Sequence, residues 1–269
     1  MIANINYVKK TLGDIKAKKK FGQNFLIDTN TVEKIAKLAC NKELTTIEIG
    51  PGLGALTEQL LKYSKNVIAY EVDKDMFELL NNNIIDENLS IYLMDFLDVD
   101  LSIYKEKLNI CSNLPYYVTT PILFKIFESE LDINKITVMV QKEVGDRLTA
   151  KVGSPDYGAL SLEVQYLFDV KQEMNISKNV FYPVPGVDSE VISFIPKVER
   201  NKEYEEKLFS IIKTSFRMRR KTLNNNLKGI YDEKIIDKIY KEMNLNKNIR
   251  AEELDLNNYQ EMYEIIYER

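Results

Sequence analysis

The chain has 269 residues and a formal net charge of −4, with 45% hydrophobic and 29% charged residues, so it can bury a core as one large domain or as one with a small second domain. It has no histidine and only two cysteines, which excludes imidazole bases and Ser-His-Asp or Cys-His nucleophiles and argues against a metal site of the zinc type. No apolar run approaches the roughly 18 residues of a membrane span, and none follows the N-terminal lysines as in a signal peptide, so we expect a cytoplasmic protein whose thiols are free and buried.

The N-terminal region contains a basic and aromatic stretch, Lys18–Leu26, which reads KKKFGQNFL and has no helical period. Two interpretations are open: an arm that lies over a site, or an ordered strap without a functional role. The first predicted helix begins near Asn30, which can form a capping box with Glu33, and apolar residues then recur at helical spacing up to position 39. Further helix N-caps are predicted at Asp75 and Thr120.

A glycine-rich turn joins the first predicted strand to a helix. The strand is Thr45–Ile49, the turn is Gly50–Gly54, which reads GPGLG, and leucines at helical spacing follow. Glycine allows the backbone to approach a ligand closely. A second strand, Asn66–Tyr70, ends at Glu71, 21 residues after Gly50. An acid at about this distance binds the ribose in nucleotide-binding βαβ units, so the pattern indicates a nucleotide site.

The next part of the chain continues the alternation of strands and helices. Three more strands are predicted here, over Leu89–Leu93, Leu108–Ser112 and Lys135–Gln141. Such alternation indicates an α/β fold with a parallel, doubly wound sheet. The carboxyl ends of its strands share one edge, where ligands bind. Because Glu71, Asp95 and Asn113 each follow a strand, we expect them to meet in one site.

The motif Asn113–Tyr116, which reads NLPY, has residue types that suit a flat base with an exocyclic amino group. Asn113 offers an amide oxygen as an acceptor. Pro115 fixes its own φ and restricts Leu114, so that their carbonyl groups can be held toward a cleft. Tyr116 offers a face on which a base can stack. The same residues are common in ordinary turns, and from these four residues alone that interpretation stays open.

Beyond a loop at residues 153–158, Ala159–Phe168 fits a helix or a strand, and we favour a helix. Two further strands are predicted over Val170–Ile176 and Glu190–Ile195. Between them lies a proline-rich, extended segment that holds Phe181. That segment could direct Phe181 into the cleft, or the ring could fill the core, and the sequence does not separate the two.

From residue 201 the apolar pattern is helical throughout, so we predict two domains: an α/β domain over residues 1–198 and a small all-helical C-terminal domain over residues 199–269. Positive charge gathers in two places. Residues 1–25 contain six lysines and one acid, and residues 213–228 contain six basic residues and no acid, on a chain that is otherwise acidic. The pattern predicts a polyanionic partner, although two solvated faces would give the same pattern.

Together these motifs resemble those of the ribosomal RNA adenine dimethyltransferases of the KsgA type, and the resemblance covers nearly the whole chain. The matching segments are residues 20–26 (KFGQNFL), 48–54 (EIGPGLG), 113–116 (NLPY), 157–161 (YGALS), 181–189 (FYPVPGVDS) and 216–223 (FRMRRKTL). Two positions depart from the family's pattern, Gly145 where alanine is expected and Gly186 where a basic residue is usual. The departures leave the implied activity intact.

The resemblance implies a Rossmann-like class I methyltransferase fold that binds S-adenosyl-L-methionine and no metal. Glu71 would hold the ribose hydroxyls and Asp95 the adenine amino group of that cofactor. The implied cofactor residues are Asn24, Leu26, Gly50, Gly52, Glu71, Asp95 and Asn113. The implied catalytic residues around the target base are Asn113, Leu114, Pro115, Tyr116 and Phe181. The basic residues expected to hold RNA are Lys18, Lys19, Lys20, Arg217, Arg219, Arg220 and Lys221, and Arg217 is expected to share a helix face with Arg220 or Lys221.

The substrate that the resemblance implies is a pair of adjacent adenosines in the 3′-terminal hairpin loop of small-subunit ribosomal RNA, each of which receives two methyl groups on N6. The partner would be this RNA in the immature small ribosomal subunit, and the protein is expected to act as a monomer. A sulfonium is already a good leaving group, so catalysis would consist of positioning and electrostatics. A chain without histidine can perform that chemistry.

Three alternatives remain open at this point. A large-subunit adenine methyltransferase of the antibiotic-resistance type has a related motif, but there it usually reads Ile-Pro-Tyr/Phe-Asn rather than the Leu114–Tyr117 sequence LPYY. A non-catalytic RNA-binding assembly factor would not need an intact NLPY motif. A nicotinamide dehydrogenase would share the glycine-rich turn and leave the NLPY motif unexplained.

Overall fold

The computed structural model describes residues 2–13, 23–197 and 200–268, which divide into two compact units. The first unit is formed by residues 1–145 with 171–196, and the second by residues 146–170 with 197–269. Residues 146–170, which we expected in the α/β domain, thus group with the C-terminal helices. The reason lies in packing within the second unit: α7 (Ala159–Leu167) packs against α8 (Lys202–Ser215) and α11 (Leu256–Tyr267).

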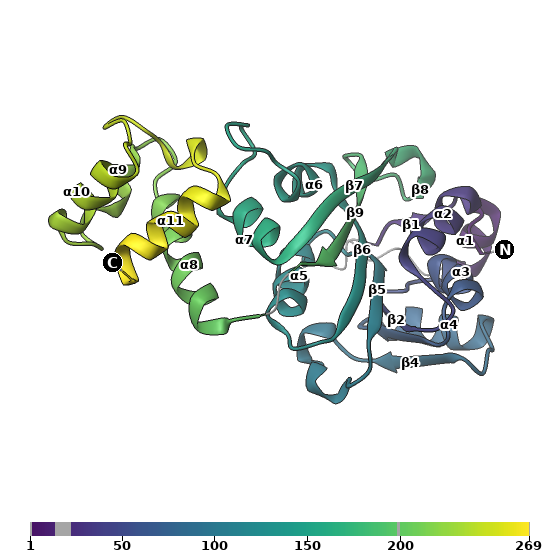
Figure 1. The fold of residues 1–269 in the computed structure, drawn as a ribbon. Helices are drawn as coiled ribbons and strands as arrows, with labels where there is room; N and C mark the ends of the chain where they lie inside the picture. The colour runs from purple at the N-terminus through teal and green to yellow at the C-terminus, as the bar shows by residue number, and fades with distance from the viewer. Residues whose placement is uncertain (1, 14–22, 198–199, 269) are drawn as a thin grey trace. The chain divides into compact units, whose positions relative to one another are not determined.

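The first unit is built around a seven-stranded sheet with the order β4-β3-β2-β5-β6-β9-β7 (Figure 1). Strands β4, β3, β2, β5 and β6 are parallel, and β9 runs antiparallel to β6. The bounds are β2 Thr45–Ile49, β3 Val67–Glu71, β4 Leu89–Leu93, β5 Leu108–Asn113, β6 Ile133–Gln141, β7 Phe168–Ile176 and β9 Ser189–Pro196. The predicted α/β class is confirmed, with an antiparallel strand added to the parallel part of the sheet.

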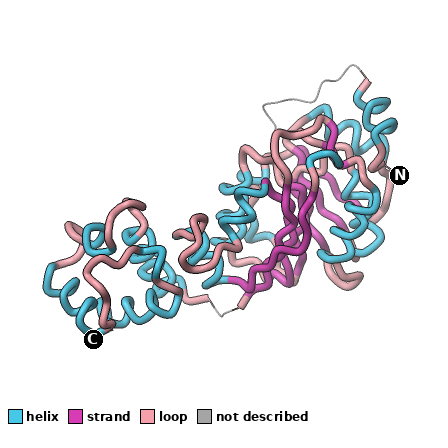
Figure 2. Tube along the Cα trace, turned by 90° about the horizontal axis from the view of Figure 1, so that it is seen from above, coloured by secondary structure: helices cyan, strands magenta, loops and turns pink. Residues whose placement is uncertain are grey.

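Helices lie on both sides of the strands (Figure 2). Those of the first unit are α1 Ile5–Leu12, α2 Thr29–Ala39, α3 Ala55–Tyr63, α4 Lys74–Asn83, α5 Thr119–Glu128 and α6 Lys142–Leu148, which extends past its border. Those of the second unit are α7, α8, α9 Leu223–Leu227, α10 Glu233–Glu242 and α11. The predicted helical C-terminal region and the helix after residue 158 are confirmed. Helix α1 was not predicted.

The central strands are buried along almost their whole length. In β2 four of five residues are buried, and in β5 only the last residue is partly exposed. Continuous burial is typical of parallel strands that are covered on both faces. From β2 the chain moves outward to β3 and β4, and then crosses back to β5 and β6 on the other side of β2. The carboxyl ends of β2 and β5 therefore form the switch point at which doubly wound sheets bind ligands.

Three helices begin earlier than the sequence pattern predicts. The N-cap of α2 is Asp28 rather than Asn30, that of α4 is Asp73 rather than Asp75, and α5 begins at Thr119, two residues early. In α2 and α4 the aspartate accepts a hydrogen bond from a backbone amide two or three residues further on. Asn and Asp are both favoured N-caps, so a sequence with several of them in a row leaves the start ambiguous.

No helix of the described residues is long and apolar enough to span a membrane. Both cysteines are free, as predicted; Cys111 is buried and Cys40 is partly buried. Burial raises the pKa of both thiols, which makes them poor nucleophiles at neutral pH.

Candidate functional site

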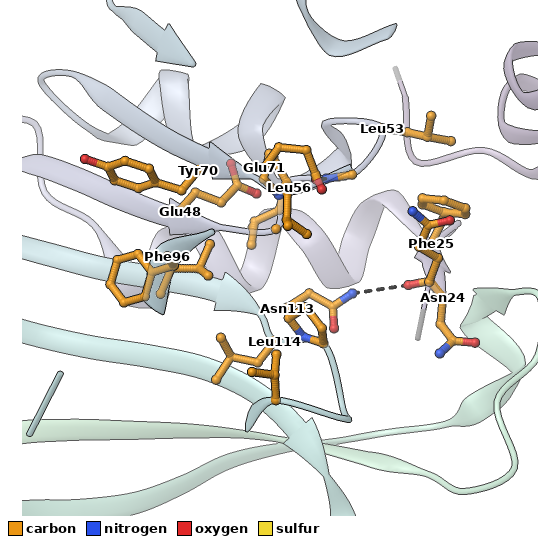
Figure 3. A pocket seen from close by; sticks show the side chains of 18 of the residues that line it. Asn24, Phe25, Glu48, Leu53, Leu56, Tyr70, Glu71, Phe96, Asn113 and Leu114 are labelled. Carbon is orange, nitrogen blue, oxygen red and sulfur yellow. Dashed lines mark hydrogen bonds between the residues drawn. The ribbon is translucent and has the colours of Figure 1, made fainter. Parts of the chain in front are cut away.

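One pocket at the switch point collects the residues that the sequence singled out (Figure 3). It is formed by the loops that follow β2, β3, β4 and β5, and by β1 (Phe25–Leu26) with the segment before it. All seven predicted cofactor residues line it, and so do the four residues of the NLPY motif. Phe181 is not among the lining residues.

The glycine-rich turn holds a carboxylate through a backbone amide. Gly50, Gly52 and Gly54 all have positive φ, at +66°, +57° and +86°, a conformation that side chains disfavour. The Gly52 amide donates a hydrogen bond of 3.0 Å to Oε2 of Glu71, and the Asp73 amide donates one of 2.8 Å to Oε1. Burial raises the pKa of Glu71, and the two amide bonds oppose that rise. A fixed acceptor therefore stands at the end of β3.

The first glycine also brings the two main motifs into contact. A Cβ on Gly50 would lie 3.3 Å from Cγ of Pro115, so a larger residue would push the NLPY motif away from the turn. Behind this contact the Ser112 hydroxyl donates to the carbonyl oxygen of Ile49 at 2.5 Å, which ties the ends of β5 and β2 together. The two motifs thus form adjacent walls of the same pocket.

Glu48 adds a second carboxyl group that the sequence analysis did not select. It lies in β2, lines the pocket and is 1% exposed. The Thr57 hydroxyl donates to its Oε2 at 2.6 Å. The Glu48 side chain lies near that of Glu71 (Figure 3). Burial, with a smaller contribution from the charge of Glu71, raises the pKa of Glu48 to about 8. The pocket therefore contains one carboxyl group that is protonated through most of the neutral range.

Asn113 is oriented by the segment in front of β1. Its amide nitrogen donates to the backbone carbonyl of Asn24 at 3.3 Å, the bond drawn as a dashed line in Figure 3. Because the nitrogen is committed to that bond, the amide oxygen is the atom left to accept a hydrogen bond from a ligand. The next residue is fixed as well, since the Leu114 amide donates to the carbonyl of Met139 at 3.1 Å.

The two carbonyl groups of the motif differ in what they already bind. That of Pro115 accepts two hydrogen bonds of 3.1 Å, from the Val118 amide and the Thr119 hydroxyl, which close the turn before α5. We expected either the Leu114 or the Pro115 carbonyl to face a ligand. Because the Pro115 carbonyl is occupied by the turn, the geometry favours Leu114.

Tyr116 is held at its hydroxyl end. The hydroxyl forms a hydrogen bond of 2.6 Å with Oγ of Ser189, a residue that is fully buried at the start of β9. Burial raises the pKa of Tyr116, so the phenol stays neutral. The next residue, Tyr117, also lines the pocket and remains 55% exposed. The motif and the residue after it therefore present one fixed and one exposed aromatic ring.

The structure places Phe181 in the core, which is the second of the two interpretations left open above. Its side chain is 1% exposed and belongs to a cluster that includes Val191 and Met139. The cause is local pairing: β8 (Phe181–Tyr182) runs antiparallel to β1, and Phe181 stands opposite Leu26. Phe181 thus supports a residue of the pocket wall and does not itself face the pocket.

The predicted basic residues are only partly described. Lys18, Lys19 and Lys20 lie outside the described residues. Arg217, Arg219, Arg220 and Lys221 are all exposed, in the turn between α8 and α9. The expectation that Arg217 shares a helix face with Arg220 or Lys221 is wrong, because α8 ends at Ser215.

The turn has a defined shape of its own. The side chain of Asn226 accepts from the Met218 amide at 2.8 Å and donates to the Met218 carbonyl at 3.3 Å. The Arg219 guanidinium donates to the carbonyl of Pro155 at 2.7 Å, within the same unit. Arg219 is therefore partly committed to the fold.

Several lining residues were missed by the sequence analysis: Ile2, Val8, Gln23, Phe25, Leu53, Val72, Met94, Phe96 and Tyr117. For two of them the sequence offered a clue to their place in the pocket. Val72 and Phe96 each come directly after an acid at the end of a predicted strand. For Ile2 and Val8 the sequence offered none, since nothing in their spacing separates them from an ordinary amphipathic helix. Within residues 2–13, 23–197 and 200–268, no cluster of acids and cysteines is arranged to hold a metal ion.

Comparison with known proteins gives a consistent result. Residues 14–268 match the family described as ribosomal RNA adenine dimethylase. A protein from Mycoplasma mobile named ribosomal RNA small subunit methyltransferase A is 42% identical over 246 residues, which is 91% of this chain and 96% of that protein. A protein of the same name from Bacillus mycoides is 40% identical over 258 residues, covering 90% and 88% of the two chains.

Solved structures agree on the fold. A dimethyladenosine transferase from Plasmodium falciparum superimposes with a TM-score of 0.76 at 22% identity, over 88% of this chain and 95% of that one. The 23S rRNA methyltransferase ErmE gives a TM-score of 0.75 at 22% identity, over 90% and 99%. The fold is thus shared with an enzyme named for 23S rRNA, whereas the relatives at 40% and 42% sequence identity are named for the small subunit. The chain belongs to the ribosomal RNA adenine dimethylase family.

Proposed function

We propose that this protein transfers methyl groups from S-adenosyl-L-methionine to N6 of two adjacent adenosines in the 3′-terminal hairpin loop of small-subunit ribosomal RNA, and that it acts on the immature small ribosomal subunit. One observation supports this most: Glu71 and the NLPY motif, separated by more than 40 positions, line the same pocket. A nucleotide cofactor and a target base would there be held side by side.

The cofactor side of the pocket has the groups that an adenosyl ligand needs. Glu71 offers two carboxylate oxygens fixed by backbone amides, which suit a pair of ribose hydroxyls. Asp95, which lines the pocket and is exposed, suits an exocyclic amino group. Val72 and Phe96 supply apolar surface next to these acids. The residues present fit the cofactor, which would supply an activated methyl group.

The target side suits an adenine amino group. In the proposed complex the two N6 hydrogens are donated to the Asn113 amide oxygen and the Leu114 carbonyl, which makes N6 more pyramidal and frees its lone pair. Tyr116, fixed through Ser189, would stack on a base that has turned out of the RNA. S-adenosyl-L-methionine bound beside the motif would supply the methyl group to N6 and would leave as its demethylated thioether, while the proton given up by N6 would pass to solvent.

The rival functions are weaker in specific ways. The two relatives at 40% and 42% identity are named for the small subunit, whereas the large-subunit enzyme ErmE is 22% identical. An inactive assembly factor would not need Asn113 to be oriented by Asn24. A dehydrogenase would have no use for the two hydrogen-bond acceptors of the NLPY motif, the Asn113 amide oxygen and the Leu114 carbonyl.

The proposal is tested by mapping methylated adenosines on ribosomal RNA from cells with and without this protein. We expect two adjacent N6-dimethylated adenosines near the 3′ end of the small-subunit RNA, present only when the protein is present. Modification of a large-subunit adenosine would favour the resistance-type enzyme. No difference between the two cells would contradict the proposal.

A further inference from the structure

The N-terminal segment, residues 2–12, lies against the pocket although it precedes the part of the chain that matches the family, which begins at residue 14. Ile2 and Val8 both line the pocket, and they are 6% and 1% exposed. No motif of the sequence drew attention to either residue. The question is whether α1 (Ile5–Leu12) merely packs against the first unit or is part of the site.

Hydrogen bonds fix the start of this segment to the two helices beside the glycine-rich turn. The Ile2 amide donates to Oε2 of Glu58, on α3, at 3.0 Å. The hydroxyl of Thr29, on α2, donates to the carbonyl of Ala3 at 3.1 Å. Asn4 then caps α1 by accepting from the Asn6 amide at 2.8 Å, so the helix direction is set from its first residue.

The inner face of α1 packs on the residues that shape the cofactor end of the pocket. Val8 and Leu12 belong to a buried cluster with Phe25, Leu53 and Met76. The Phe25 ring packs closely on the glycine-rich turn, because a Cβ on Gly52 would lie 3.2 Å from Cε1 of that ring. The contacts thus run from α1 through Phe25 to Gly52, whose amide holds Glu71.

The opposite face of α1 is exposed and serves as an internal control. Asn6 and Lys10 are exposed on this face, whereas Lys9 lies 5.4 Å from the centroid of the ring of Tyr182, which packs against the buried cluster. Substitutions on this face change the same helix without touching the pocket wall.

We propose that residues 2–12 form one wall of the S-adenosyl-L-methionine pocket, with Ile2 and Val8 as positioning residues that slow release of the cofactor. The inference rests on the proposed function only in naming this ligand. Loss of the apolar wall would open the pocket to water and loosen Phe25 above the turn. Cofactor binding would then weaken through a faster dissociation rate, because the wall slows the release of bound cofactor more than it affects the rate of association.

The test compares an Ile2→Ala/Val8→Ala variant with an Asn6→Ala/Lys10→Ala variant of the full chain. Calorimetry measures the Kd for S-adenosyl-L-methionine and for its demethylated product, and stopped-flow fluorescence measures release. The wall variant should bind both about 10-fold more weakly, with release faster by a similar factor, while the control stays within about twofold. Affinity for the RNA substrate, measured without cofactor, should be equal in both variants.

A second variant guards against simple loss of folding. Glu58→Gln removes the charged acceptor of the Ile2 amide and leaves the apolar wall in place, so release should be faster than in wild type but slower than in the wall variant. If thermal unfolding shows that the wall variant is folded and its affinity and release rate equal those of wild type, α1 is only a packed helix. Should the wall variant not fold, an unchanged release rate in Glu58→Gln overturns the proposal. If wild type itself does not bind the cofactor, it is the proposed function that fails.

Discussion

The backbone amide of Gly52 donates a hydrogen bond of 3.0 Å to the carboxylate of Glu71, and this bond joins the glycine-rich turn to the end of the neighbouring strand. Gly52 donates this bond from a turn in which its φ is +57°, a conformation that other residues disfavour. The other carboxylate oxygen is held by the Asp73 amide at 2.8 Å. Glu71 is therefore oriented before any ligand arrives.

Replacing Glu71 should weaken the cofactor site. In Glu71→Ala the ribose loses a charged acceptor worth about 1.5–3 kcal/mol, so the Kd for S-adenosyl-L-methionine should rise about 10- to 150-fold. Glu71→Gln keeps the shape of the side chain but not its charge, so its Kd for S-adenosyl-L-methionine should lie between those of Glu71→Ala and wild type. Calorimetry provides the measurement, with Glu78→Ala, an exposed acid on α4, as control. Unchanged affinity in Glu71→Ala would refute the assignment, and tight binding of NADH by wild type would favour a dehydrogenase.

Gly145, where the resemblance led us to expect alanine, stands against a buried acid. A Cβ on Gly145 would lie 2.3 Å from Oε2 of Glu190, which is fully buried. Glu190 cannot turn away freely, because its Oε1 accepts from Lys142 at 2.9 Å and from Gln172 at 2.7 Å. The glycine thus makes room for the glutamate.

We therefore expect Gly145→Ala to destabilise the protein by about 1–3 kcal/mol through overpacking, although alanine is the better helix former by about 1 kcal/mol. The double variant Gly145→Ala/Glu190→Ala should lose less unfolding free energy than the sum of the losses in the two single variants. Denaturant unfolding measures both, and Gly186→Ala is the control because its Cβ would meet nothing within 4 Å. Additive single effects would show that the two positions are not coupled.

Glu48 should make stability depend on pH. Burial raises its pKa from 4.5 to about 8, so the folded protein holds this proton more tightly than the unfolded chain. The stability contribution is complete below pH 4.5 and is lost as the pH rises through about 8, with a slope of up to about 1.4 kcal/mol per pH unit. Glu48→Gln should flatten the profile of unfolding free energy over this range.

The residual slope in Glu48→Gln should have the same sign, because burial also raises the pKa of Glu71. Replacing Glu43, an exposed acid before β2, by glutamine should leave the profile as in wild type. Equal profiles for wild type and Glu48→Gln would mean that Glu48 is not the titrating group.

The basic turn between α8 and α9 should bind RNA phosphates. Replacing Arg217, Arg220 and Lys221 by alanine should flatten the slope of log K against log salt by about 2 to 3 units, at about 0.7–0.9 per lost contact. Arg219 is left in place because it bonds to Pro155. Cofactor affinity should stay the same, since none of the three lines the cofactor pocket.

Removal of an equal number of charges elsewhere on the second unit provides the control. Lys234, Lys241 and Lys247 are all exposed and lie outside the turn. Their replacement by alanine should change the salt slope much less. If both triple variants give the wild-type slope while folded, the turn is a solvated face and RNA is held elsewhere.

The sequence predicts the sheet well because its strands are short apolar runs between clear breaks, and because strand ends carry the polar residues of the site. Glu71, Asp95 and Asn113 could be placed together by topology alone, before any distance was known. The sequence could not place Phe181, since an aromatic residue after an extended loop suits a cleft or a core equally. Only the pairing of Phe181 with Leu26 decides it.

Other misses have the same origin in tertiary contacts. In the sequence the segment at Arg217 continues the helical pattern, because no glycine or proline follows Ser215 to end the helix. The turn that forms there instead is shaped by the side chain of Asn226, which accepts a hydrogen bond from the Met218 amide. Likewise, Ile2 and Val8 become pocket residues only through α1 packing, which no local pattern encodes. Residues 146–170 group with the second unit, although we predicted them in the first, because α7 packs against α8 and α11.

The most direct test of the account is the rate of methyl transfer by Asn113→Ala with RNA and cofactor both saturating. Asn113 is held by Asn24, and its amide oxygen is the proposed acceptor for adenine N6. Mass spectrometry of small-subunit RNA should show N6-dimethylation of two adjacent adenosines by wild type. In Asn113→Ala the saturated rate should fall by at least about 100-fold, while RNA affinity stays within about threefold. A saturated rate close to that of wild type would contradict the account.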